Sequence, residues 1–365
     1  MRTPHKLLLG ALSALVVSGP VMAEDVVHIY NWSDYIAPDT VENFEKATGI
    51  DATYDVFDSN EKLEAIMLAG DSGYDVVVPS GTFLERQIQA GAYQKLDKSK
   101  IPNWKHLDKE LLKRVAAYDP GNQYAVPYMW GTTGIGYNVD MVKERLGDDF
   151  KINTWDLLFD PDVAKKLQDC GIAFLDAPSE VLPAALNYIG EDPNGEDPDA
   201  LQRALDQLMK VRPYIKYFHS SQYVNDLANG DICVAMGWSG DVYQAKWRAQ
   251  EADQGVNVNY TIPREGALVW FDLWAIPADA PNVDNAHKWL NYILKPKVNA
   301  KLIDYVWYAS ANKTAKEYAN PEITQDPSVY PSEAVKKRLF PSITPESQSY
   351  VRLQTRALTK LKTGQ

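Results

Sequence analysis

The chain has 365 residues, of which 24% are charged, and its formal net charge is −12. An acidic balance of this size argues against a surface that binds nucleic acid and favours cationic partners. The length predicts two domains rather than one, and with 45% hydrophobic residues these can bury a substantial core.

The segment 1–23 predicts a signal peptide. Arg2 and Lys6 precede an apolar run, and Val21 and Ala23 occupy the −3 and −1 positions of a cut after Ala23. The run is too short, and too close to this cleavage site, to be a membrane anchor. The sequence therefore predicts an exported protein that does not insert into the membrane.

Cys170 and Cys233 are the two cysteines of the chain. In an oxidising compartment an isolated pair favours a disulfide. A metal site is disfavoured, because no histidine or further cysteine stands at ligand spacing from either residue. We therefore predict one disulfide and no metal.

The start of the mature chain predicts a βαβαβ unit. Strand-like runs cover 26–30, 50–57 and 74–79, and helical patterns cover 38–48 and 58–70. This order is typical of a doubly wound α/β domain, in which ligands bind beyond the carboxyl ends of the strands. Residues 32–35 and Ser80 follow the first and third strands, so both lie at the predicted ligand edge.

The rest of the chain alternates between apolar strands and helical patterns, without an internal repeat. The glycine-rich, aromatic run 128–138 is interpreted as a strand that crosses between two lobes. Further strands are predicted at 232–238 and 268–276, and further helices at 198–211, 221–229, 240–251 and 284–294, with a surface loop at 190–198.

Aromatic residues stand next to carboxylates at three distant points of the sequence. Trp270 precedes Asp272 by two positions, and similar pairs occur in 32–35 and 238–241. Aromatic rings can enclose a methylene chain and face a cation, while a buried carboxylate binds ammonium. Asp272 interrupts an apolar run, where an unpaired charge would be costly. The pattern predicts a pocket for an elongated organic cation.

Other chemistries have less support. The sequence around Ser239 fails the G-x-S-x-G pattern of a serine hydrolase, because Asp241 stands in place of the second glycine. The run 131–136 is neither a P-loop nor a dinucleotide fingerprint and is expected to serve backbone packing or a hinge. Paired carboxylates with tryptophans are also typical of a glycosidase. Sequence spacing does not give the distance between the carboxylates in space, so it does not exclude this alternative. For a single carboxylate such as Asp34, a helix cap is the structural alternative.

Seven segments together resemble the periplasmic spermidine/putrescine-binding proteins of ABC importers. They are HIYNWSDYIAPDT (28–40), DVFDSNE (55–61), YDVVVPS (74–80), PYMWGTTGIGYN (127–138), FLDAPSE (174–180), YFHSSQYVNDLANGDICVAMGWSGD (217–241) and FDLWAIPADA (271–280). The likeness extends over essentially the whole mature chain.

The resemblance implies an α/β, two-lobed solute-binding fold of type II, with a central mixed sheet flanked by helices in each lobe. Lobe 1 would comprise 24–131 and 256–312, and lobe 2 would comprise 132–255 and 313–365, with the ligand cleft between them. It implies no catalysis and no cofactor, a periplasmic monomer, and delivery of a polyamine to an inner-membrane ABC permease. The ligand-binding residues that it implies are Trp32, Ser33, Asp34, Tyr35, Ser80, Glu180, Trp238, Asp241, Trp270, Asp272 and Tyr308.

The residue two positions before Asp272 bears on ligand preference. It is Trp270 here, as in the spermidine-preferring members that the chain resembles, whereas putrescine-preferring members have phenylalanine. Spermidine is therefore the expected ligand, although Tyr308 is shared with the putrescine type. The alternatives are an exported carboxylate-dependent glycosidase and a receptor of the same fold that serves another solute or sensing.

Overall fold

The computed structural model describes residues 25–343 and 345–364. The predicted signal peptide and its cleavage after Ala23 lie outside this part of the chain. Among the helices of the described part, none combines the length and the apolar character needed to cross a bilayer.

The predicted βαβαβ unit is present at the start of the described chain. It consists of β1 (Val26–Trp32), α1 (Thr40–Thr48), β2 (Asp51–Phe57), α2 (Asn60–Ala69) and β3 (Val76–Val77). Both β2 and β3 pair with β1 in parallel. Strand β3 is shorter than the predicted 74–79. The Asp75 carboxylate binds the backbone N–H groups of His28 and Asn282, and Pro79 has no N–H to donate.

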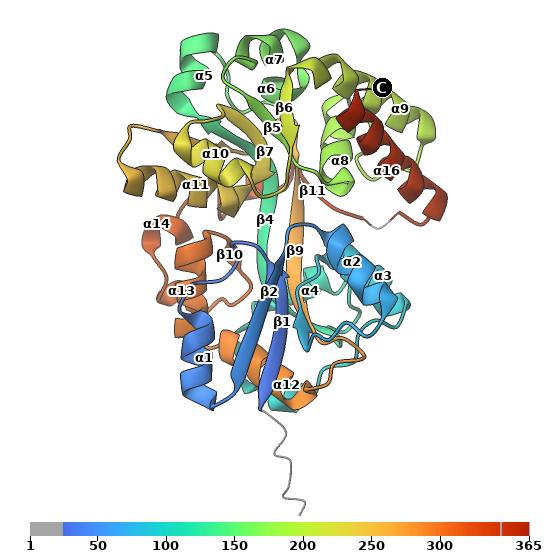
Figure 1. Cartoon of the computed structure of the whole chain (residues 1–365), viewed down its shortest axis with the longest axis vertical. Coiled ribbons are helices and arrows are strands. Elements are labelled where there is room, and N and C mark those ends of the chain that lie inside the picture. Colours follow the sequence, from blue (N-terminus) through green and yellow to red (C-terminus); the bar gives the residue numbers. More distant parts are fainter. Residues whose placement is uncertain (1–24, 344, 365) are drawn as a thin grey trace, which may run out of the picture.

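Two long antiparallel strands, β4 (Ala125–Asn138) and β9 (Ala267–Ala275), run through the middle of the molecule and join its two halves (Figure 1). The sheet order is β2-β1-β3-β9-β4-β7-β5-β6, so the strands of both halves belong to one mixed sheet. The prediction that 128–138 crosses between the lobes is confirmed. Gly131 permits close packing here, because a Cβ atom would lie 2.7 Å from the Trp270 ring.

We call the lower half of Figure 1 lobe 1 and the upper half lobe 2. Besides the first unit, lobe 1 contains α3 (Gly81–Gln89), α4 (Lys109–Val115), α12 (Val283–Ile293) and α13 (Pro296–Val306). Lobe 2 contains α5 (Val139–Leu146), α6 (Asp156–Phe159), α7 (Pro161–Leu167), β5 (Ile172–Phe174), α8 (Pro178–Tyr188), α9 (Pro198–Val211), β6 (Ile215–Phe218), α10 (Tyr223–Asn229), β7 (Val234–Trp238), α11 (Ser239–Ala252) and α16 (Gln348–Thr363). The shorter elements are β8 (Val258–Thr261), β10 (Ala309–Ser310), α14 (Pro321–Thr324), α15 (Glu333–Lys336) and β11 (Leu339–Pro341).

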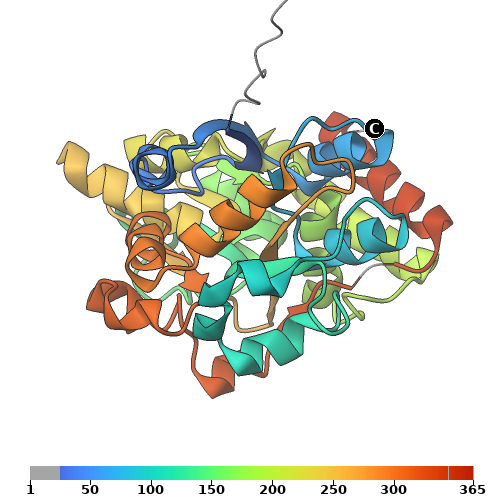
Figure 2. The ribbon, with the colours of Figure 1, turned by 90° about the horizontal axis from the view of Figure 1, so that it is seen from below.

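Helices surround the central strands, as the view from below shows (Figure 2). The buried core is continuous from β1 and β4 to β7 and α8. Amphipathic helix α9 has the range expected from its periodicity, because its apolar residues recur on one face and all of that face is buried. The mixed α/β class predicted from the sequence is thus confirmed.

The predicted disulfide joins Cys170, just after α7, to Cys233, just before β7, with a Cα–Cα distance of 5.4 Å. Both cysteines are buried. The bridge ties the start of a central strand to the helix layer of lobe 2.

Candidate ligand-binding site

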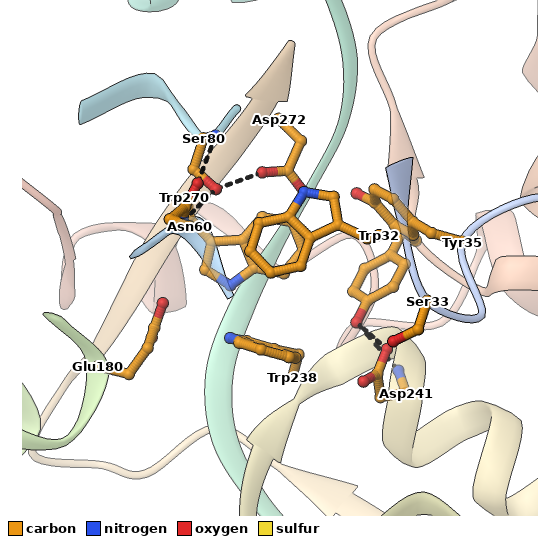
Figure 3. A pocket seen from close by; sticks show the side chains of 11 residues that line it. Trp32, Ser33, Tyr35, Asn60, Ser80, Glu180, Trp238, Asp241, Trp270 and Asp272 are labelled. Carbon is orange, nitrogen blue, oxygen red and sulfur yellow. Dashed lines mark hydrogen bonds between the residues drawn. The ribbon is translucent and has the colours of Figure 1, made fainter. Parts of the chain in front are cut away.

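A narrow pocket lies where the ends of several strands meet α8 and α11 (Figure 3). Its lining residues are Trp32, Ser33, Tyr35, Asn60, Ser80, Glu180, Trp238, Asp241, Trp270, Asp272 and Tyr308. All of the predicted site residues except Asp34 are therefore brought to one cavity. Residues far apart in sequence meet here because β1 and β3 of lobe 1 run opposite to β7 of lobe 2, so that their carboxyl ends face each other at the pocket.

Asp272 is a buried carboxylate in the middle of β9, with 4% of its surface exposed. The Ser80 hydroxyl donates to its Oδ1 at 2.6 Å, and the two residues also form an isolated antiparallel bridge. Burial raises the pKa of Asp272 to about 7. No lysine, arginine or histidine of the described chain forms an ion pair with it, so its charge is left for a ligand to compensate.

Asp241 lies in the first turn of α11, where the N-terminal end of the helix dipole favours a carboxylate. The hydroxyls of Tyr308 and Tyr223 donate to its two oxygens at 2.7 and 2.9 Å. Burial nevertheless raises its pKa to about 6. Gly240 permits this packing, because a Cβ atom there would lie 2.4 Å from the Tyr308 ring.

Glu180 lies in the first turn of α8 and lines the opposite side of the pocket from Asp241, with Trp238 between them in the view of Figure 3. The Thr133 hydroxyl donates to Glu180 Oε2 at 2.6 Å. Burial raises the pKa of Glu180 to about 8. Three carboxylates with raised pKa values thus line one pocket.

Aromatic rings form the walls between these carboxylates. Trp32 of lobe 1 meets Trp238 of lobe 2 edge to face, with ring centroids 5.7 Å apart. Tyr308 contacts both Tyr35 and Trp270 in the same way, each at 5.2 Å. The Trp270 indole N–H is buried without a hydrogen-bond partner among the described residues. The walls can surround a slender chain, and their faces can attract cations.

Asp34 does not line the pocket. It follows β1 in a left-handed conformation with φ of 57°, and its carboxylate accepts a hydrogen bond from Arg248 of α11 at 2.8 Å. Gln244 donates to the Asp34 carbonyl oxygen at 3.1 Å. Asp34 therefore links lobe 1 to lobe 2 beside the pocket. This contact was not predictable from the sequence, because Arg248 is 214 positions from Asp34.

Asn60 also lines the pocket, although no sequence pattern predicts this. Ser59, which precedes α2, accepts from the Lys62 N–H and caps the helix. The neighbouring Asn60 is instead buried against Ser80. The sequence offers one indication of this role: Asn60 is a polar residue beside a serine that already caps the helix, so its side chain is free for another contact.

The chemistry of the pocket is that of a cation receptor. Carboxylates and aromatic rings dominate its lining, and the described lining includes no basic side chain. Within residues 25–343 and 345–364, no group of three or more His, Cys, Asp or Glu side chains is placed to hold a metal ion.

Comparisons with known proteins agree with this geometry. Residues 39–331 match the family model described as bacterial extracellular solute-binding protein. The chain is 55% identical to the putrescine-binding periplasmic protein PotF of Escherichia coli K12 over 98% of this chain and 97% of that protein. It is 53% identical to the putrescine-binding periplasmic protein SpuD of Pseudomonas aeruginosa UCBPP-PA14, over the full length of both.

Among solved structures, a putative spermidine/putrescine ABC transporter protein from Listeria monocytogenes superposes with a TM-score of 0.83 at 33% identity. The superposition covers 93% of this chain and 100% of that one. It confirms the predicted two-lobed, type II fold. The relatives are solute-binding proteins rather than enzymes, which confirms the predicted non-catalytic role. The chain belongs to the family of bacterial extracellular solute-binding proteins.

Proposed function

We propose that the protein is a periplasmic receptor that binds a polyamine, with putrescine as its preferred ligand, and delivers it to an ABC permease. The observation that carries this proposal is the convergence of Glu180, Asp241 and Asp272 in a pocket lined by aromatic rings and by no basic side chain of the described chain. A diamine supplies two ammonium groups for these carboxylates and a methylene chain for the rings. A neutral diol would leave the carboxylates buried and unpaired.

The preference for spermidine expected from Trp270 is not supported. The relatives above 50% identity are named as putrescine-binding proteins, whereas those named for spermidine and putrescine are 32–36% identical. The indole of Trp270 packs between Gly131 and Tyr308, so it is a wall of the pocket whichever ligand is bound. The similarity of the whole chain to putrescine-binding proteins is thus stronger support for the ligand preference than Trp270 alone.

The glycosidase alternative has no support either, since the relatives are binding proteins. The proposal also includes delivery to a permease and a monomeric state. It includes lobe boundaries at 131/132, 255/256 and 312/313. Export with cleavage after Ala23 belongs to it as well, supported by the periplasmic location in the names of the relatives.

A titration of ligand-stripped protein followed by tryptophan fluorescence tests ligand choice, because three indoles line the pocket. Putrescine is expected to change the emission at lower concentration than spermidine does. Tighter binding of spermidine would overturn the putrescine proposal and restore the expectation drawn from Trp270. A response to neither would overturn polyamine binding itself.

Polyamine affinity is expected to rise between about pH 5 and pH 8. The pKa values of Asp241, Asp272 and Glu180 are about 6, 7 and 8, and an ammonium group requires their ionised forms. Binding in this range should therefore release protons. Calorimetric titrations in two buffers of different ionisation enthalpy measure that release, and a flat affinity without proton release would contradict the assignment of these groups.

The raised pKa values also make the free energy of unfolding of the ligand-free protein depend on pH, in a direction that can be predicted. Each folded pKa lies above the ordinary carboxyl value near 4, so the unfolded state loses its protons first as the pH rises. The free energy of unfolding contributed by these groups should fall from about pH 4 to pH 8. Bound polyamine should raise the thermal midpoint more at pH 8 than at pH 5.

Removing the ion pair between Arg248 and Asp34 is expected to weaken binding modestly. Their side chains are 30% and 36% exposed, so the pair is worth about 1 kcal/mol or less. Arg248→Gln should therefore weaken polyamine binding up to about fivefold, with a larger loss at low salt than at high salt. Arg145→Gln is the matched control, because Arg145 pairs with Asp169 inside lobe 2. Equal effects of both substitutions would show that the interlobe pair does not contribute to binding.

A further inference from the structure

Asn60, the first residue of α2, holds Ser80 by two hydrogen bonds. Its Nδ2 donates to Ser80 Oγ at 3.0 Å, and its Oδ1 accepts from the Ser80 backbone N–H at 3.0 Å. Rotating the amide by 180° would place its NH2 group against that N–H, donor against donor. The amide orientation is therefore fixed by its partners.

This orientation determines the direction of the next hydrogen bond. A serine hydroxyl has one proton, and Ser80 Oγ already accepts from Asn60. The proton is left for Asp272 Oδ1, 2.6 Å away. Asp272 thereby accepts in this bond, which favours its ionised form and lowers its pKa against the effect of burial.

Neither Asn60 nor Ser80 uses its side chain to cap a helix. Helix α2 is capped by Ser59, whose hydroxyl accepts from the Lys62 N–H. Ser80 precedes α3 at the N-cap position, yet its side chain makes no capping hydrogen bond to that helix. Both polar groups are instead committed to the series of hydrogen bonds that ends at Asp272, which we call the Asn60 relay (Asn60, Ser80 and Asp272; Figure 3).

We propose that Asn60 is a positioning residue of the polyamine site, which acts through Ser80 to hold Asp272 as the ionised acceptor for an ammonium group. The proposal rests on the proposed function for its effect on affinity. Its effect on the titration of Asp272 is independent of any ligand. Asn60 itself is not required to touch the polyamine.

A double-mutant cycle tests whether Asn60 acts through Ser80. Asn60→Ala is expected to weaken putrescine binding about three- to tenfold, the range of one uncharged hydrogen bond. In a Ser80→Ala background the same substitution should change affinity less than twofold, because the relay is already broken. Equal losses in both backgrounds would overturn the proposal.

The ligand-free protein provides the second readout. Carboxyl-carbon NMR should show the Asp272 titration midpoint move upward by about half a unit or more in Asn60→Ala, since the ionised form loses support. Ser59→Ala is the matched control: it removes the cap of α2 and should lower stability while leaving the midpoint unchanged. An unchanged midpoint in Asn60→Ala, or an equal shift in Ser59→Ala, would overturn the proposal.

The two hypotheses fail in different ways. If wild-type protein binds no polyamine but the Asp272 midpoint shifts in Asn60→Ala, the relay stands and the proposed function falls. If the wild type binds putrescine and the midpoint stays in place, the function stands and the relay falls.

Discussion

Asp272→Asn is expected to weaken polyamine binding by about 1.5–3 kcal/mol, or roughly ten- to 150-fold. The substitution keeps the shape of a side chain that is 4% exposed, but it removes the charge that an ammonium group would meet. It also replaces one of the two acceptor oxygens with an NH2 donor, so the Ser80 hydroxyl and the ligand no longer have an acceptor oxygen each. The affinity is measured by calorimetric titration at neutral pH.

Asp148→Asn is the control for this experiment. Asp148 is an exposed carboxylate that pairs with Lys143 on lobe 2, so its removal changes the net charge equally without reaching the pocket. Its affinity should remain close to that of the wild type. An affinity of Asp272→Asn within twofold of the wild type would remove Asp272 from the site.

Replacing both Cys170 and Cys233 with alanine is expected to lower the free energy of unfolding by roughly 4 kcal/mol. The bridge closes a loop with a sequence separation of 63 residues, and the chain-entropy model assigns about this value to a loop of that length. Such a loss is a large part of the 5–15 kcal/mol that is typical of folded domains. Denaturant titration followed by circular dichroism measures it.

Reductant provides the control for the disulfide. It should destabilise the wild type by a similar amount and leave the double-alanine variant unchanged. Polyamine affinity at low temperature should survive in the variant, because neither cysteine lines the pocket. A loss of stability below about 1 kcal/mol would contradict the entropic account of this bridge.

Much of the fold was predictable because local patterns and tertiary structure agree. Helix α9 and strand β9 appear almost at their predicted limits, since one has a single apolar face and the other is buried throughout. Strand β3 was overestimated, because the apolar run 74–79 does not reveal that Asp75 turns to bind Asn282. Continuous burial and hydrogen-bonded pairing are different properties, and only burial is visible in the composition.

The candidate site was predictable only in part. Aromatic residues next to carboxylates indicated the pocket chemistry, and Asp272 was identified by the cost of burying its charge. The partner of Asp34 could not be predicted, because Arg248 is distant in sequence and lies on the other lobe. Asn60 was missed for a similar reason, since its role depends on a contact with Ser80 that the fold creates.

Calorimetric titration of the ligand-stripped protein with putrescine tests polyamine binding most directly. The expected result is one-to-one binding, accompanied by proton release near neutral pH and by a higher thermal midpoint of unfolding. Absence of both heat and thermal stabilisation, with putrescine and with spermidine alike, would contradict the account of a polyamine receptor.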